Sequence, residues 1–195
     1  MDPRTNLGDI EPHGFFDDLG SHFIDFIQTL VVFGAIFALL YLFVAQFHKV
    51  SGQSMFPTMH DGDYLITEKI SLRLGEPKRG QIIVSKNPKD ESQDFIKRIL
   101  ALPGDTIKVE KNSVFVNGIK LEESYLPPGV ITEAKQFLTE GVTVKASANQ
   151  YFILGDNRSH SSDSRDWGPI TKEQIVGKAF FRNWPPSSIG SLTNK

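Results

Sequence analysis

Three short segments carry side chains that could perform acyl-transfer chemistry. Ser54 lies in a stretch of Gly, Pro and small polar residues (51–58), and Lys97 lies in an apolar run (94–99). A third segment (155–168) is rich in Asp, Arg and Ser and almost free of aliphatic side chains. Serine can attack a carbonyl when a nearby base takes its proton. Taken singly, the three segments are equally typical of a turn, an edge strand and a surface loop.

The run around Lys97 favours a β-strand with a desolvated amine. Strand alternation places Lys97 on the same face as Phe95 and Ile99, while Ile96 and Arg98 point to the other face. An amine buried among apolar side chains loses hydration, which lowers its pKa by roughly 3 to 5 units. The other interpretation is a lysine whose stem lies along the strand and whose amine reaches water.

Composition excludes several functional classes. The 195 residues include no cysteine, which rules out disulfides, thiolate metal sites and a cysteine nucleophile. The formal net charge of −2 argues against a nucleic-acid-binding protein. The polar segment 155–168 lacks the spacing of a calcium loop and contains two arginines, so no metal is expected there.

An uncharged run predicts a membrane anchor. Residues 30–45 contain no charged side chain, and extending the run to 26–47 gives about 33 Å of helix, which is enough to cross a bilayer. The run is apolar on every face, unlike a helix on the surface of a soluble domain. A cleaved signal peptide is disfavoured because Arg4 is the only basic residue before the run. We therefore expect an N-terminal tail (1–25), a transmembrane anchor (26–47) and a body (48–195).

The body is expected to be mainly antiparallel β-sheet. Short runs rich in Val, Ile, Phe and Tyr alternate with Gly, Asn, Asp and Pro, and helical periodicity is nearly absent. The dipeptide Asn117-Gly118 between two such runs predicts a two-residue hairpin turn with positive φ at both positions. No linker divides the body, so we expect one β-rich unit that contains at most two lobes. The predicted strands are 64–67, 81–85, 95–101, 106–110, 113–116, 119–121, 151–154 and 177–181.

Four segments, in their order along the chain, resemble sequence boxes of the bacterial type I signal peptidases. These segments are SGQSMFPT (51–58), GDYL (62–65), DFIKRILALPGD (94–105) and GDNRSHSSDSRDWG (155–168). The family consists of membrane-bound serine proteases that remove signal peptides from exported proteins. The likeness covers about residues 51–184, and one preceding anchor fits the family. It implies a mainly β catalytic body of the kind also found in self-cleaving repressors.

The resemblance implies a Ser/Lys dyad. Ser54 would be the nucleophile, and Lys97 would be the general base that replaces the histidine of other serine hydrolases. Ser161 matches the family serine whose hydroxyl bonds the lysine amine and orients it. Four charged residues would support the site without taking part in the chemistry: Asp156, Arg158, Asp163 and Arg165.

The oxyanion formed during acyl transfer needs preorganised hydrogen-bond donors. The backbone N–H of Ser54 is the natural first donor. Some family members place a serine hydroxyl two residues before the nucleophile as the second donor, but this chain has Gly52 there. Ser51 and Gln53 are therefore the candidates for the second donor.

The resemblance also implies how substrates bind. Small residues precede the cleavage site of a signal peptide, so shallow apolar pockets are needed, and Met55 and Ile96 match their walls. The substrate would lie extended along residues 95–97 by strand addition. Three apolar side chains are expected to form a patch that rests on the bilayer: Phe56, Met59 and Trp184. For Phe56, a place in the core is the alternative.

Signal peptides and the lipid bilayer are the expected partners, and the chain is expected to act as a monomer without any cofactor. By analogy with the family, the N-terminal tail would lie in the cytoplasm and the catalytic body outside the cytoplasmic (inner) membrane. The chain's own charges add little to this orientation, because Arg4 and Lys49 flank the run on both sides.

Three alternatives stay open at this point. Ser54 could act with His160 and either Asp163 or Asp156 in a histidine triad. The self-cleaving repressors share the Ser/Lys dyad but carry a DNA-binding helix-turn-helix before the β-body, where this chain has an apolar run. A noncatalytic, membrane-tethered module that binds peptides would carry a similar body without the chemistry.

Overall fold

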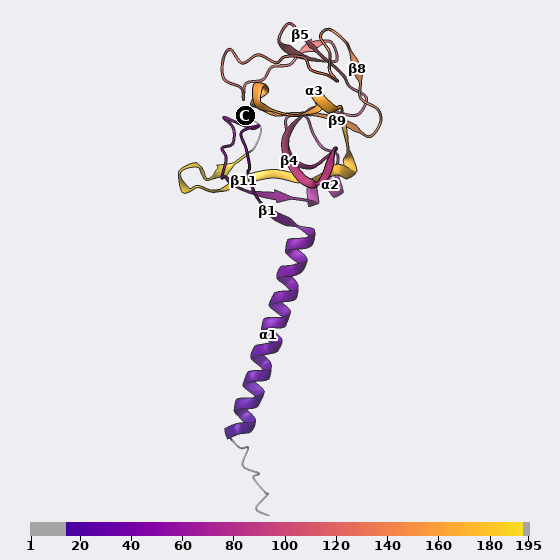
Figure 1. Cartoon of the computed structure of the whole chain (residues 1–195). Helices are drawn as coiled ribbons and strands as arrows, with labels where there is room; N and C mark the ends of the chain where they lie inside the picture. The colour runs from indigo at the N-terminus through magenta and orange to yellow at the C-terminus, as the bar shows by residue number, and fades with distance from the viewer. Residues whose placement is uncertain (1–14, 193–195) are drawn as a thin grey trace, which may run out of the picture. The chain divides into compact units, whose positions relative to one another are not determined.

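The computed structural model describes residues 15–192, and it separates into two compact units, Met1–Leu42 and Phe43–Lys195. The first unit contributes one long helix, and the second is a β-rich body (Figure 1). The expected architecture, one apolar helix followed by antiparallel β-sheet, is therefore confirmed. Most of the predicted N-terminal tail lies outside the described residues.

Helix α1 (Phe15–Phe43) contains the apolar run. Its window His22–Leu39 has a mean hydropathy of 1.8 and is long enough to cross a membrane. The helix ends at Phe43 instead of continuing to the end of the predicted anchor, because β1 (Ala45–Lys49) takes the next residues. These pair with β2, from Ala45 opposite Glu68 to Lys49 opposite Tyr64. An apolar run alone cannot separate the end of a helix from a strand that follows it.

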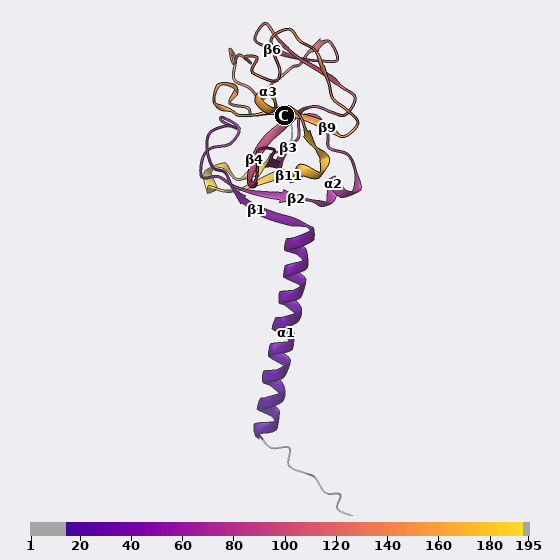
Figure 2. The same ribbon diagram turned by 45° about the vertical axis from the view of Figure 1, so that its right-hand side comes forward.

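Two antiparallel sheets form the body. In Figures 1 and 2 the smaller sheet lies on the side of the body opposite β1 and β2. The larger sheet has the order β1-β2-β11-β3-β4-β9-β10, with β12 beside β11. Its strands are β1 (Ala45–Lys49), β2 (Tyr64–Glu68), β3 (Ile82–Asn87), β4 (Asp90–Ala101), β9 (Gln150–Leu154), β10 (Ile170–Thr171), β11 (Ile175–Trp184) and β12 (Gly190–Ser191). The smaller sheet, in the order β7-β6-β5-β8, consists of β5 (Thr106–Glu110), β6 (Ser113–Val116), β7 (Ile119–Lys120) and β8 (Val144–Lys145).

All eight predicted strands are present, and those of the smaller sheet coincide best with the sequence pattern. Asn117 (φ 53°) and Gly118 (φ 78°) form the predicted positive-φ turn between β6 and β7. Four strands were not predicted: β1, β8, β10 and β12. The last three are two residues long, too short for alternation to show. Short helical turns connect the strands: α2 (Ile70–Leu74), η1 (Arg158–His160), α3 (Ser164–Trp167), η2 (Lys172–Gln174) and η3 (Pro186–Ser188).

The body is held together by apolar clusters that share its longest strand. One cluster joins the smaller sheet to the end of β4, through Leu100 and Ala101. A second packs Ile99 of the same strand against Ile83 of β3. The third underlies the segment that follows β1, and Met55 is part of it. Because β4 contributes to two cores, its side chains are fixed by packing on both sides of the sheet.

Candidate active site

Ser54 and Lys97 lie in direct contact. The Ser54 Oγ and Lys97 Nζ atoms are 2.8 Å apart, which is hydrogen-bond distance. The amine also donates to the Ile96 carbonyl at 3.1 Å, which limits its rotation. A groove of about 300 Å³ passes beside these atoms, between residues 48–55 on one side and residues 94–97 of β4 on the other.

The Lys97 side chain is removed from water. It is 3 % exposed, and its Nζ lies 4.9 Å from the centre of the Phe95 ring. Burial lowers the pKa of Lys97 to about 8, although Asp163 and Asp156 act in the opposite direction. The amine is therefore neutral in about half of the molecules at pH 8, against well under about 1 % for an ordinary lysine. The predicted desolvated lysine is what the structure contains.

The polar segment (155–168) follows β9 and holds the backbone of residues 51–58 around Ser54, which we call the serine turn. Asn157 donates its N–H to the Ser54 carbonyl at 3.0 Å and its side-chain amide to the Gln53 carbonyl, also at 3.0 Å. Gly155 approaches the same turn so closely that a Cβ atom there would lie 2.4 Å from the Ser54 carbonyl oxygen and 2.2 Å from the Ser161 hydroxyl. Sequence reasoning missed both contacts. The glycine in GDNRS was the one signal that could have pointed to a close approach.

A buried ion pair joins this segment to β4. Arg98 binds Asp156 through two hydrogen bonds, of 2.9 and 2.7 Å. The Thr58 hydroxyl also donates to Asp156, at 2.6 Å, so this carboxylate ties the serine turn to the strand that carries Lys97. Arg98 was expected on the strand but had been given no role. The bracing role that the family resemblance implies for Asp156 stays a prediction, and these contacts are the ones through which it would act.

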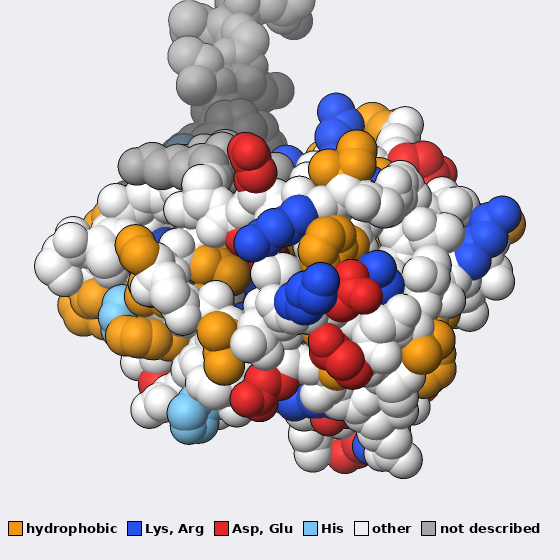
Figure 3. Space-filling view, turned by 90° about the horizontal axis from the view of Figure 1, so that it is seen from above, with side chains coloured by type: hydrophobic (Ala, Val, Ile, Leu, Met, Phe, Trp, Pro, Cys, Tyr) orange, Lys and Arg blue, Asp and Glu red, His pale blue; other side chains and the backbone are white. Residues whose placement is uncertain are grey.

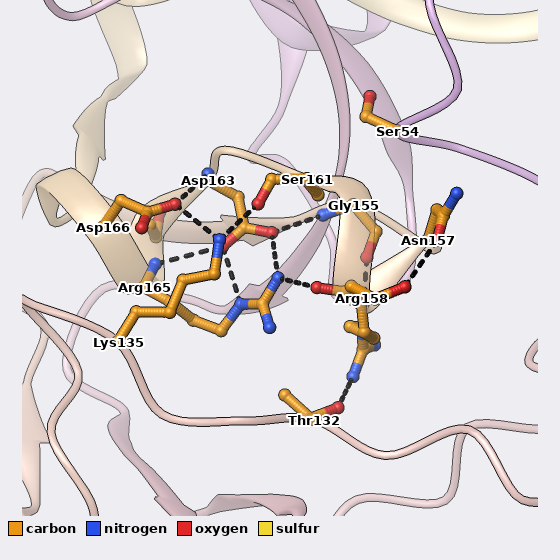
Figure 4. Close-up of polar contacts among 12 residues, drawn as sticks. Ser54, Thr132, Lys135, Gly155, Asn157, Arg158, Ser161, Asp163, Arg165 and Asp166 are labelled. Carbon is orange, nitrogen blue, oxygen red and sulfur yellow. Dashed lines mark hydrogen bonds and ion pairs between the residues drawn. The ribbon is translucent and has the colours of Figure 1, made fainter.

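A second ion pair lies inside the polar segment (Figure 4). Both oxygens of Asp163 accept from Arg165 at 2.9 Å, and Asp163 also accepts the Gly155 N–H at 3.1 Å. Burial alone would raise the pKa of Asp163, but the Arg165 guanidinium and these hydrogen bonds hold it below its usual value. Arg158 donates to the Gly155 carbonyl at 3.0 Å and pairs with Glu123. All four charged residues are buried, and no hydrogen bond joins any of them to the Ser54 hydroxyl among residues 15–192. Their role as supports of the site stays a prediction.

Ser161 does not form the expected bond to Lys97 in this structure. Its side chain is buried next to Gly155. The Ser161 hydroxyl lies only 2.2 Å from the position that a Cβ atom on Gly155 would take. The hydroxyl lies near the Asp163 carboxylate and helps to lower its pKa, but it has no partner of good hydrogen-bond geometry among the described residues. The orienting bond from Ser161 to Lys97 therefore stays a prediction.

The family model described as "Signal peptidase, peptidase S26" matches residues 23–184. The chain belongs to this family. A probable signal peptidase I-2 of Synechocystis is 42% identical over 160 residues, covering 78% of this chain and 69% of that protein. A signal peptidase I of Leptolyngbya laminosa is 39% identical, covering 77% and 74%. A signal peptidase I of Bacillus caldolyticus is 42% identical over 157 residues, covering 76% and 84%. The chain is a serine endopeptidase anchored to a membrane.

The groove of this peptidase contains both predicted wall residues. Met55 and Ile96 line it, and both also pack on the cluster beneath the serine turn. The predicted bilayer patch was wrong in one member. Met59 is fully buried in that cluster, because its N–H bonds to the Met55 carbonyl and the turn folds its side chain inward. Phe56 and Trp184 are about half exposed, as expected for a surface patch.

The histidine alternative finds no support in the geometry. His160 borders the groove, but its ring contacts the Ser159 hydroxyl at 2.8 Å, and the lysine amine occupies the position next to Ser54. Asp163 and Asp156, its proposed partners, are bound to arginines. Among residues 15–192, no group of His, Asp or Glu side chains has the arrangement of a metal site.

Proposed function

We propose that this enzyme cleaves signal peptides from preproteins, with Ser54 as nucleophile and Lys97 as general base. The observation that carries the proposal is the 2.8 Å contact between the Ser54 hydroxyl and a buried amine of lowered pKa. The named relatives are signal peptidases.

Two unpaired strand edges border the groove. β1 pairs only with β2, and β9 pairs with β4 only from Arg98 onward, so residues 90–97 of β4 have a strand partner on one side among the described residues. An extended substrate can therefore add its backbone to the edge of β4, as the resemblance implied, and approach β1 on its other side. Met55 and Ile96 would then limit the side chains that fit before the scissile bond.

The chemistry follows from this arrangement. Neutral Lys97 accepts the Ser54 proton as the oxygen attacks the scissile carbonyl. The Ser54 N–H, which donates to no group among the described residues, is free to bind the oxyanion. Protonated Lys97 then gives its proton to the leaving amine, and an acyl ester on Ser54 remains. Water, deprotonated by the same lysine, attacks the ester and releases the signal peptide with a free carboxyl group.

The proposal places the body on the extracytoplasmic side of the cytoplasmic membrane, where exported proteins emerge. The side of the body that carries the smaller sheet suits an aqueous environment, because acidic and basic side chains are interspersed there (Figure 3). Protease accessibility of the body in spheroplasts tests this orientation. We further propose that the enzyme acts as a monomer, since both members of the dyad come from one chain.

The proposed function is tested by incubating a purified preprotein with the full chain in detergent. We expect cleavage after the small residue at the end of the signal peptide, and no cleavage by Ser54→Ala. Mass spectrometry of the products identifies the bond. If Ser54→Ala processes the preprotein normally, or if the wild-type chain leaves it intact, the proposal is wrong. The chain would then be a noncatalytic module that binds peptides.

The pH dependence of kcat/KM should report the lysine. Protonated Lys97 cannot take the serine proton, so activity should fall below pH 8 by about tenfold per unit, with an apparent pKa of about 8 for the acidic limb. The profile is measured with the preprotein, and the His160→Ala variant should give the same limb. An acidic limb centred near pH 6.5 in the wild type, lost in His160→Ala, would point instead to histidine as the base.

A further inference from the structure

Lys135 contacts the polar segment from a part of the chain that the sequence boxes do not include. Its Nζ donates to the Ser161 carbonyl at 2.6 Å and to the Asp166 carboxylate at 2.8 Å (Figure 4). No other donor to the Ser161 carbonyl is found within residues 15–192. Asp166 in turn accepts the N–H of Asp163 at 3.2 Å, so the ammonium links two points of the segment.

Lys135 belongs to a stretch (132–138) that we call the clamp segment. Its ends are fixed at the smaller sheet. The Thr132 N–H donates to the Asn112 carbonyl at 2.9 Å, and Leu138 is fully buried in the core cluster of that sheet. Its backbone also binds the polar segment. The further contacts are Phe137 N–H to Arg165 carbonyl (2.8 Å), Leu138 N–H to Arg165 carbonyl (3.1 Å), Arg165 Nη1 to Glu133 carbonyl (3.2 Å) and Arg158 to the Thr132 hydroxyl.

The Ser161 side chain has little freedom to move without affecting the nucleophile. A Cβ atom on Gly155 would lie 2.2 Å from the Ser161 hydroxyl. The same atom would lie 2.4 Å from the Ser54 carbonyl oxygen. Ser161 and the serine turn are therefore packed against the same glycine. The side chains of its neighbours His160 and Ser162 are exposed. The hydrogen bond that holds the Ser161 backbone therefore comes from the clamp segment, through Lys135.

We propose that Lys135 is a positioning residue of this peptidase: by holding the Ser161 carbonyl, it keeps the Ser161 side chain in place beside the Ser54–Lys97 pair. The inference rests on the proposed function, because it assumes that this pair performs the chemistry. Lys135 itself touches neither reacting atom. It acts through Ser161, so its removal should slow the reaction without weakening the binding of substrate.

The test is steady-state kinetics of full-length Lys135→Met, which removes the charge and keeps the bulk of the chain. We expect kcat to fall about tenfold with KM within about twofold, since small displacements of catalytic groups are costly. Lys135→Arg, whose guanidinium can reach both acceptors, should restore most of kcat. In a Ser161→Ala background, Lys135→Met should cause no further loss, because the residue through which it acts is gone.

Lys108→Met is the matched control. Lys108 lies in β5 of the smaller sheet and has nearly the same side-chain exposure as Lys135 (25% against 27%). Its replacement removes a comparable ion pair, of 2.9 Å with Glu110. Its kcat should equal that of the wild type. The proposal is overturned if Lys135→Met retains wild-type kcat, if Lys108→Met loses as much, or if the tenfold loss persists in the Ser161→Ala background.

If Lys135→Met does not fold, Lys135→Gln is measured instead, because its side chain is too short to span both acceptors, and the same criteria apply. Failure of the proposed function has a different signature. In that case Ser54→Ala would cleave the preprotein like the wild type, whatever happens at Lys135.

Discussion

Replacing Lys97 by methionine should lower kcat by about 10⁴-fold or more, while the protein stays folded. Methionine fills nearly the same volume, so packing around β4 is kept, but no group remains to take the Ser54 proton. The measurement is cleavage of the preprotein under single-turnover conditions, with circular dichroism to confirm folding. Lys97→Ala should lose as much activity.

His160→Ala is the control, because His160 also borders the groove and is exposed. Its kcat should stay within about twofold of the wild type. Losses of similar size in Lys97→Met and His160→Ala would sink the dyad assignment.

Lys97→Met should also raise stability at neutral pH. The folded protein holds the lysine at a pKa of about 8 against an ordinary value of 10.5, so the unfolded chain binds that proton more tightly. Folding therefore loses roughly 3 kcal/mol below pH 8, and this loss disappears as the pH rises from 8 to 10.5. Wild-type stability should accordingly increase across that window, and the increase should be absent in Lys97→Met when both are followed by denaturant unfolding.

Gly155→Ala should be the most damaging substitution outside the dyad. Its methyl group would lie within 2.4 Å of the Ser54 carbonyl, a backbone atom that can yield only if the serine turn moves. We expect kcat to fall by about 10²-fold, as for a displacement of about 1 Å. The free energy of unfolding should fall by about 1 to 3 kcal/mol, as in other overpacked sites. Kinetics and thermal unfolding measure the two effects.

Gly190→Ala provides the comparison, since nothing lies within 4 Å of the added atom there. It should leave activity and stability near the wild type. Wild-type kcat in Gly155→Ala would show that the polar segment does not set the position of Ser54.

The sequence predicted most of the body because its strands alternate over four or more residues between Gly, Asn and Pro turns. The alternation around Lys97 even predicted its apolar surroundings. The end of α1 could not be found in the same way, because β1 continues the apolar composition and becomes a strand only by pairing with β2. Met59 was placed on the surface for a similar reason: its exposure depends on how the turn after Ser54 folds.

Local sequence patterns and the family resemblance predicted the residues of the site, but they did not predict the contacts between distant segments. The contact from Asn157 to the Gln53 carbonyl spans 104 residues, and that from Lys135 to Ser161 spans 26. No pattern in the sequence distinguishes Asn157 from a surface asparagine or Lys135 from a surface lysine. Such contacts arise from tertiary packing, which spacing along the chain does not encode.

The groove between the unpaired edges of β1 and β4 has a consequence for enzymes that are crowded together in one bilayer. A free strand edge is also a template for a strand of a neighbouring copy, and such pairing would block the groove to preprotein. Charged residues lie at both edges, Lys49 on β1 and Asp94 on β4, where Asp94 is paired with Lys86, and they oppose the insertion of an apolar strand, which favours the proposed monomer. Neutralising both charges should leave the catalytic reaction unchanged. Preprotein cleavage per enzyme should then slow at high surface density, because neighbouring copies would block one another's grooves.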